Sequence, residues 1–353
     1  MKGYQKLLCS SAAVMVLMTA GSALAGPQGG VVSAGNATIQ TINKKTNIHQ
    51  SSNKAIIDWR SFDIAPDEHT QFYQPSKTSV TLNRINDVKP SQIDGRISAN
   101  GHVVLVNPNG VVFGAGSQVD VGALTATSAD IDNDAFMNGR MNFDKAGNLD
   151  AKIINEGTIT AKEAGLVSLV APHVENRGVI EAKLGKIQLA AADTFTLDLA
   201  GDGLIYIAVT EDEAKKLVRN SGRITAEGGT IGLTAGRART LVDSLVDNSG
   251  VIEAHSMTNV GGRIVLSAHQ GTTQVSGTID ASGKLGGGQV LIGGGKQGQD
   301  AAIAHNAKTV VEESAVIKAN ATDIGDGGQV ILWADDQTVF AGSIEAKGGQ
   351  NGG

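Results

Sequence analysis

The chain has 353 residues, a formal net charge of −6 and a single cysteine. This mild acidity disfavours nucleic acid or anionic lipid as the main partner, and one cysteine excludes an internal disulfide framework. Glycine is the compositional outlier, with 46 residues that fall mostly at the edges of short β-branched runs. This arrangement indicates many strands and many corners.

The first 25 residues have the pattern of a secretory signal peptide. Lys2 and Lys6 provide a basic start, an apolar stretch follows, and Ala-Leu-Ala at 23–25 fits a small-x-small cleavage site. The apolar stretch is too short for a stable membrane span. We therefore expect residues 1–25 to be removed on export, which leaves a chain without cysteine.

Residues 26–97 contain irregular strand-like runs and an early tryptophan, Trp59. A stack of β-strands needs its first layer protected against edge-to-edge pairing. We therefore expect this segment to cap the amino-terminal end of the fold.

Residues 98–131 contain two apolar runs separated by Asn107, Pro108, Asn109 and Gly110. Pro108 fixes φ near the value needed at the second position of a turn, and Asn109 tolerates the left-handed region at the third. Gly110 then releases the chain into the next run. The pattern predicts a strand, a tight turn and a second strand.

Several blocks around this turn resemble the amino-terminal secretion domain of filamentous-haemagglutinin-type exoproteins, the passengers of bacterial two-partner secretion (TPS). In chain order the blocks are residues 47–50 (Asn-Ile-His-Gln), 55–64 (Ala-Ile-Ile-Asp-Trp-Arg-Ser-Phe-Asp-Ile), 72–75 (Phe-Tyr-Gln-Pro), 82–85 (Leu-Asn-Arg-Ile), 107–110 (Asn-Pro-Asn-Gly) and 120–124 (Asp-Val-Gly-Ala-Leu). Two departures are small: Asp58 stands where family members often carry Asn, and a short Ala-Asn-Gly at 99–101 precedes the first apolar run.

The resemblance implies a route of export and a partner. Family members leave by the Sec pathway, cross the periplasm unfolded and are recognised by the periplasmic domains of an outer-membrane β-barrel transporter. The implied secretion motif consists of Asn100, Asn107, Pro108, Asn109 and Gly110. Mature members are mostly adhesins or haemagglutinins, and others are haemolysins, contact-dependent growth inhibitors or haem-acquisition proteins. We expect a secreted or cell-surface adhesin whose distal regions contact host-cell or bacterial glycans or receptors.

Internal repetition dominates residues 151–353. The phrase Asn-x-Gly-x-Ile-x-Ala begins at residues 155, 176, 220 and 248, and weaker copies lie near 275, 314 and 341. A second phrase, Gly-x-Ile-x-Leu, follows most of these copies. The intervals of 21, 44, 28 and 27 predict one coil, two coils, and then single coils with longer corners. Short alternating strands at this period indicate an all-β, right-handed parallel β-helix with glycine and asparagine at its corners. A β-propeller, with four strands per ~40–45 residues, stays open.

Two segments interrupt the strand pattern. Residues 210–219 have a capping threonine, acids in the first turn and bases in the last, which predicts a short helix on a corner excursion. Residues 130–143 carry four large apolar side chains and predict a second excursion that covers exposed core: Phe136, Met137, Met141 and Phe143.

No motif predicts a metal, a cofactor or a catalytic centre. The seven histidines are scattered, without a His-x-x-x-His pair. Asp130, Asp132 and Asp134 resemble the start of a calcium loop, but the glycine and the glutamate of such a loop are missing, so a solvated turn is favoured. The Gly-Gly-Gly-Lys at 293–296 lacks the first glycine and the final hydroxyl residue of a phosphate loop, so a flexible corner is favoured.

Three functions besides an export module for an adhesin stay open. A β-helix can carry a polysaccharide-cleaving enzyme, which needs carboxylates that converge in one cleft. The adjacent pairs at 312–313 and 335–336 point to opposite faces of a strand, and aromatic residues are few, so we expect no enzyme. The chain could also form the stalk of a contact-dependent inhibition toxin, or a structural solenoid exported without a partner.

The sequence thus predicts three parts. These are a signal peptide at 1–25, the cap and first coils of a TPS secretion domain at 26–150, and further β-helix repeats at 151–353. The end of the chain resembles a corner inside a repeat, so we expect a fragment of a longer protein. Because coils contact only their neighbours, emerging chain can fold outside the cell, and a charge buried at Ile180 or Ile252 should impair export.

Overall fold

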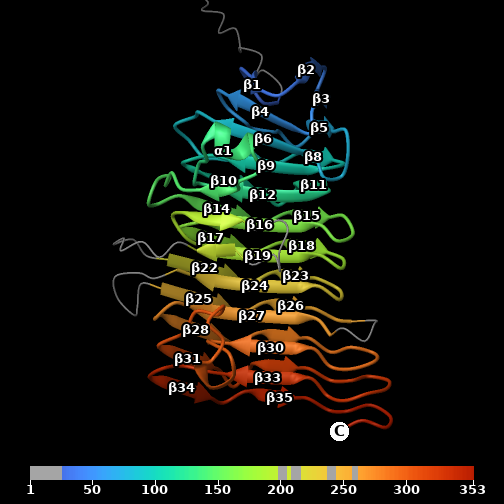
Figure 1. The fold of residues 1–353 in the computed structure, drawn as a ribbon, viewed down its shortest axis with the longest axis vertical. Helices are drawn as coiled ribbons and strands as arrows, with labels where there is room; N and C mark the ends of the chain where they lie inside the picture. The colour runs from blue at the N-terminus through green and yellow to red at the C-terminus, as the bar shows by residue number, and fades with distance from the viewer. Residues whose placement is uncertain (1–25, 198–204, 208–215, 237–243, 257–260) are drawn as a thin grey trace, which may run out of the picture.

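The computed structural model describes residues 26–197, 205–207, 216–236, 244–256 and 261–353. The predicted signal peptide lies outside these residues. The described chain winds into a parallel β-helix, with its coils stacked from the blue end to the red end of the ribbon (Figure 1). The predicted fold class is therefore confirmed. Within the described residues, no helix has the length and apolar character needed to cross a membrane.

Three long sheets form the faces of the β-helix. Sheet I has 11 strands, in the order β1 (Val31–Ala34), β4 (Lys54–Trp59), β6 (Val80–Ile85), β9 (His102–Val106), β12 (Ala123–Thr127), β16 (Leu166–Ala171), β19 (Lys186–Ala191), β24 (Thr230–Ala235), β27 (Arg263–Ala268), β30 (Gln289–Ile292) and β33 (Gln329–Leu332). Sheet II has 9 strands, in the order β7 (Ser91–Ile93), β10 (Gly110–Phe113), β14 (Lys152–Asn155), β17 (His173–Asn176), β22 (Lys216–Asn220), β25 (Ser244–Asn248), β28 (Thr272–Val275), β31 (Lys308–Val311) and β34 (Gln337–Phe340). Sheet III has 12 strands, in the order β2 (Ala37–Ile42), β3 (Lys45–Gln50), β5 (His69–Tyr73), β8 (Arg96–Ala99), β11 (Gln118–Val121), β15 (Thr158–Ala161), β18 (Val179–Ala182), β23 (Arg223–Thr225), β26 (Val251–Glu253), β29 (Thr278–Asp280), β32 (Val316–Lys318) and β35 (Ser343–Glu345).

The repeated isoleucine forms the centre of the core. In sheet III, Ile159 pairs in parallel register with Ile180, and Ile180 with Ile224. All three side chains are fully buried, while their strand neighbours face outward. This alternation is the period-2 pattern of a strand with one buried face. The prediction that Ile159 and Ile180 point inward is confirmed.

The amino-terminal cap is shorter than expected. In the three long sheets as described, antiparallel pairing is confined to β1 on β4 and β2 on β3. From β3 onward, strands already stack in parallel, and Trp59 in β4 lies in register with Ile85. Trp59 is buried and donates from Nε1 to Asn83 Oδ1 at 3.0 Å. It therefore belongs to the first coil of the helix core.

The 44-residue interval between the repeated phrases at residues 176 and 220 is one coil, so the prediction of two coils is wrong. β17 pairs directly with β22, β18 with β23 and β19 with β24. Among the described residues between β19 and β22, β20 (Phe195–Leu197) and β21 (Ile205–Ile207) lie outside the three long sheets. Spacing alone cannot separate an added coil from an enlarged corner, because both preserve the register.

The helix predicted over 210–219 is also wrong where the structure describes it. Residues 216–219 lie in β22, and the earlier part of the predicted helix is outside the described residues. Lys216 is buried in an ion pair with Asp193, and Val218 points into the core. Stacking on β17 overrides the local helix propensity, which is a weak preference.

The asparagines of the repeated phrase do not serve as positive-φ corners. Asn155, Asn176, Asn220 and Asn248 are fully buried, and none of them has a positive φ. Their side chains stack inside the helix, and each of the first three donates from Nδ2 to Oδ1 of the next at 2.8 Å. Buried amides are stable here because each finds a partner in the neighbouring coil. We call these four residues the asparagine ladder.

The excursion predicted at 130–143 is confirmed as a cover over exposed core. It contains α1 (Asn133–Met137) and β13 (Asn142–Phe143), which lie against the outer face of sheet I in the upper part of Figure 1. Phe136, Met141 and Phe143 pack on outward-facing side chains of that sheet, among them Leu82 and Val104. β13 also pairs with β20, and Phe143 stacks on Phe195 with ring centroids 4.6 Å apart. A smaller cover, with the 3-10 helix η1 (Lys296–Gly298), brings Ile303 onto Val265 and Leu291.

Candidate functional site

The turn at 107–110 connects β9 of sheet I to β10 of sheet II. The amide of Gly110 donates to the carbonyl of Asn107 at 2.9 Å, which closes a four-residue turn. The side chain of Asn107 accepts a second bond, at 2.9 Å, from the amide of Asn109. The predicted strand, turn and strand are therefore present. The expectation that Asn109 is left-handed is wrong, because the positive φ, 104°, falls on Gly110.

Neighbouring coils hold the turn on both sides. Asn107 is fully buried, and its Nδ2 donates to the carbonyl of Lys89 and to Oγ of Ser91, both at 3.0 Å. Asn109 Nδ2 donates to the carbonyl of Asp87 at 2.9 Å. On the other side, the carbonyl of Pro108 accepts from the amide of Asn148 at 2.9 Å.

The members of the predicted motif divide into buried and surface residues. Asn107 and Gly110 are buried and shape the corner, whereas Pro108 and Asn109 are half-buried and contribute to the surface. The outer surface at this corner therefore combines Pro108 and Asn109 with the segment 87–91. We call this combination the turn surface.

Asn100 lies apart from the turn. It precedes β9, whereas the turn follows β9, so roughly 20 Å of extended strand separates them. Asn100 Oδ1 accepts from the amide of Gln74 at 2.8 Å, and its Nδ2 donates to the carbonyl of Gln74 at 2.7 Å. The structure thus brings four of the five predicted site residues together and places Asn100 at another corner.

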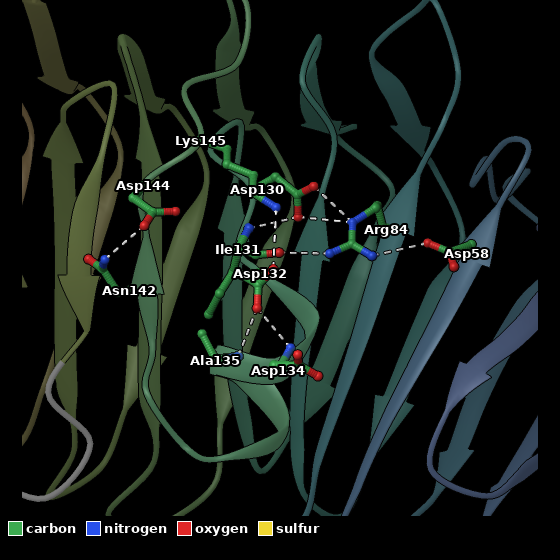
Figure 2. A network of polar contacts seen from close by, with 10 residues as sticks. All are labelled: Asp58, Arg84, Asp130, Ile131, Asp132, Asp134, Ala135, Asn142, Asp144 and Lys145. Atoms are coloured by element: carbon green, nitrogen blue, oxygen red, sulfur yellow. Dashed lines mark hydrogen bonds and ion pairs between the residues drawn. The ribbon is translucent and has the colours of Figure 1, made fainter.

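Arg84, which no sequence pattern marked as a site residue, joins three segments (Figure 2). Its Nε donates to both carboxylate oxygens of Asp130, at 2.9 and 2.8 Å, and a terminal nitrogen lies 3.3 Å from Asp58 Oδ1. Another terminal nitrogen donates to the carbonyl of Ile131 at 2.8 Å. Such forked contacts suit the planar guanidinium. Arg84 therefore attaches the α1 cover to sheet I. The sequence offered one indication of this contact, because Asp58 and Arg84 both lie in blocks that resemble the family.

The TPS secretion domain model matches residues 23–285, which is most of the chain. The chain belongs to this family. The secretion domain of HMW1 from Haemophilus influenzae is similar in structure, with a TM-score of 0.76, 30% sequence identity and coverage of 92% of this chain and 91% of the other.

Two curated relatives, both from Haemophilus influenzae, carry the name heme/hemopexin-binding protein. One is 37% identical over 223 residues, which cover 61% of this chain, and the other is 35% identical over 247 residues, which cover 64%. The chain spans about a quarter of the length of these relatives, 24% and 26% respectively.

In the secretion domain, two of the three aspartates of the calcium-like pattern have separate structural tasks. Asp130 binds Arg84, and Asp132 Oδ1 caps α1 by accepting from the amides of Asp134 and Ala135 at 2.9 and 3.1 Å (Figure 2). These backbone bonds hold the pKa of Asp132 below its usual value. Among the described residues, no three histidine, cysteine or acidic side chains gather in a way that could hold a metal ion.

The secretion domain also contains a buried histidine at the start of β9, the strand that leads into the turn. His102, at the start of β9, is buried, and its Nε2 lies 2.9 Å from Oγ1 of Thr125. Burial lowers the pKa of His102 to about 4, because removal from water penalises the charged imidazolium. This imidazole is therefore neutral at physiological pH.

Proposed function

We propose that this chain directs the export of an exoprotein through an outer-membrane β-barrel transporter. The observation that carries the proposal is the family match over residues 23–285. The turn surface is the part that the transporter's periplasmic domains recognise, with Asn107 and Gly110 shaping it and Asn109 contributing to the contact. Residues 1–25 act as the signal peptide, and the remainder is secreted or reaches the cell surface.

Coil-by-coil folding supplies a direction to this export. Each strand of the helix core pairs with strands from neighbouring coils, so emerging chain does not need its distant carboxyl-terminal part in order to fold. Folding outside the membrane opposes backward movement of the chain. Export can then proceed without ATP at the outer membrane.

The test is secretion of the chain from a host with and without the cognate transporter. We compare wild type with Asn107→Ala and Asn109→Ala, and use Asn86→Ala as the matched control, since Asn86 is exposed near the turn. We expect wild type and control in the medium only when the transporter is present. Asn109→Ala should lose export while the refolded protein stays folded and loses only about 1 kcal/mol of stability with its bond to Asp87, which separates recognition from folding. Export of Asn109→Ala at the wild-type level would overturn the role of the turn.

For the whole protein, we propose binding of heme or hemopexin as the first candidate and cell adhesion as the second. The names of the two curated relatives favour the first over the adhesin that we expected from the resemblance. The test is retention of the full-length protein on immobilised hemin and on immobilised hemopexin, beside adherence to cultured cells. Retention on neither matrix, together with adherence, would favour the adhesin.

We propose no catalytic activity, because the family is a secretion domain of exoproteins. The carboxylates considered for polysaccharide cleavage have local partners. Glu312 accepts from Gln274, and Asp335 Oδ1 accepts from Nε1 of Trp333 at 3.1 Å and pairs with His305. Cleavage of a polysaccharide by the purified chain would contradict this proposal.

A further inference from the structure

A cleft of about 430 Å³, lined mostly by residues of polar and charged types, lies at a corner of the β-helix in the carboxyl-terminal half of the chain. It lies at the ends of β26, β29 and β32, and the loops that lead from β29 and β32 back to sheet I project at the lower right of Figure 1. The residues that define its chemistry are Glu227, His255, Asp280, Lys284, Lys318 and Thr322.

One ion pair in the cleft is already complete. His255 Nε2 lies 3.2 Å from Asp280 Oδ2, and Asp280 Oδ1 accepts from the amide of Ser282 at 2.9 Å. The hydrogen bond that Asp280 accepts from His255 raises the pKa of His255, although burial opposes this shift. Both carboxylate oxygens of Asp280 are therefore engaged.

The two lysines of the cleft have unused donors. Within the described residues, neither Lys284 nor Lys318 makes a side-chain hydrogen bond or an ion pair. In sheet III, Lys318 stands in register between Asp280 and Glu345. Glu345 also has its own partners, since it accepts from Asn320 Nδ2 at 3.1 Å and pairs with Lys347.

One carboxylate of the cleft remains available as an acceptor. Glu227 is exposed and makes no side-chain bond within the part of the chain that the structure describes. Once the His255–Asp280 pair is set aside, two ammonium groups stand against this single carboxylate. The cleft thus presents two ammonium groups without a side-chain partner among the described residues, on a protein whose net charge is −6.

We propose that this cleft binds an acidic saccharide, a uronic or sialic acid residue. Lys284 and Lys318 hold the sugar carboxylate, while Glu227 and Thr322 bond to ring hydroxyls. Among the described lining residues there is no aromatic ring besides the imidazole of His255, which is engaged with Asp280, so a neutral sugar or a nucleobase has no stacking surface.

The cleft extends past the family-matched region. The match ends at residue 285, whereas Lys318 and Thr322 lie beyond it. The site is therefore a property of this chain in addition to export, and its test is independent of secretion.

The experiment is calorimetric titration of the purified chain with glucuronic acid and with N-acetylneuraminic acid. Glucose and inorganic phosphate are the comparison ligands, and the variants are Lys318→Ala and the double variant with Lys284→Ala. Lys308→Ala is the matched control, since Lys308 is an exposed lysine of sheet II. We expect at least one acid sugar to bind, with affinity about tenfold weaker in Lys318→Ala and unchanged in Lys308→Ala. Added salt should weaken binding, because exposed ammonium groups are screened.

Two results would overturn the proposal. The first is that neither acid sugar binds, or that binding is equal in wild type and the double variant. The second is that phosphate binds as tightly as the acid sugars and competes with them, which would show that the cleft responds to charge alone. Far-ultraviolet circular dichroism of each variant verifies that the β-helix is intact.

Discussion

Gly110 occupies a position in the turn where any side chain would be strained. Its φ is 104°, and a β-carbon placed on it would lie 2.2 Å from the carbonyl oxygen of Lys152 in the next coil. The corner therefore needs glycine both for backbone conformation and for the approach of a neighbouring strand. This close approach is a property of the stacked coils.

We predict that Gly110→Ala destabilises the folded chain by about 2 kcal/mol or more. The control is Gly116→Ala, because the nearest atom to a β-carbon there is 3.6 Å away and φ is not positive. Urea unfolding of the purified variants measures both changes. Equal stability of the two variants would contradict the assignment of strain to Gly110.

Burial of His102 predicts a loss of stability in acid. Its folded pKa, about 4, is below the ordinary value of 6.5, so below pH 6.5 the unfolded chain binds a proton that the folded chain does not. The free energy of unfolding should fall by about 2 kcal/mol between pH 7 and pH 5 on this account. His102→Gln removes the titrating imidazole. In urea unfolding, the variant's free energy of unfolding should therefore fall by about 2 kcal/mol less than that of wild type between pH 7 and pH 5. An identical pH dependence in both proteins would show that His102 makes no such contribution.

At the scale of elements, the asparagine ladder links four consecutive coils of sheet II. Each inner member both donates and accepts within a buried column, so the loss of one side chain removes one hydrogen bond from each of its two neighbours. The ladder ends at Asn248, which stands in register with Val275. The column therefore favours one alignment of these coils over others.

We predict that Asn176→Ala lowers the free energy of unfolding by about 2–4 kcal/mol, through unpaired amides and an internal cavity. Asn248→Val should lower the free energy of unfolding by less than half as much as Asn176→Ala, because Val275 is the native residue at the same position one coil later. Chemical denaturation of both variants provides the comparison. A larger loss in Asn248→Val would show that the ladder does not stabilise its interior members cooperatively.

At the scale of the whole molecule, one continuous core runs through the stacked coils, from Ile48 to Ile317. The covers on sheet I use residues distant in sequence, as in the contact between Arg84 and Asp130. The core can therefore grow coil by coil, while the outer face of sheet I is completed later. This order follows from N-to-C emergence of the chain, which is part of the proposed export route.

We predict that Ile180→Asp reduces secretion through the cognate transporter by at least tenfold, because it places an uncompensated charge in a fully buried column. Thr158→Asp is the control, since Thr158 is exposed on the neighbouring strand β15 and stands in register with the uncharged Gln118 and Val179. Immunoblots of medium and periplasm measure the ratio of secreted to retained protein for each variant. Normal export of Ile180→Asp would show that folding of the coils does not drive movement across the membrane.

Local sequence determined the coil, because alternating apolar residues and glycine corners act within a few residues of each other. Strand, turn and strand at 107–110 and the inward isoleucines were predictable for that reason, and the family-like blocks indicated the secretion domain. The role of the motif in recognition stays a prediction. Tertiary structure alone decided that the 44-residue interval is one coil, that Lys216 lies in a strand and that Asn176 points inward. It also decided which residues bond to Arg84 and which residues line the cleft beside Lys284 and Lys318. Each of these depends on which coils lie beside one another, and the corners that set this order vary in length without changing the local pattern.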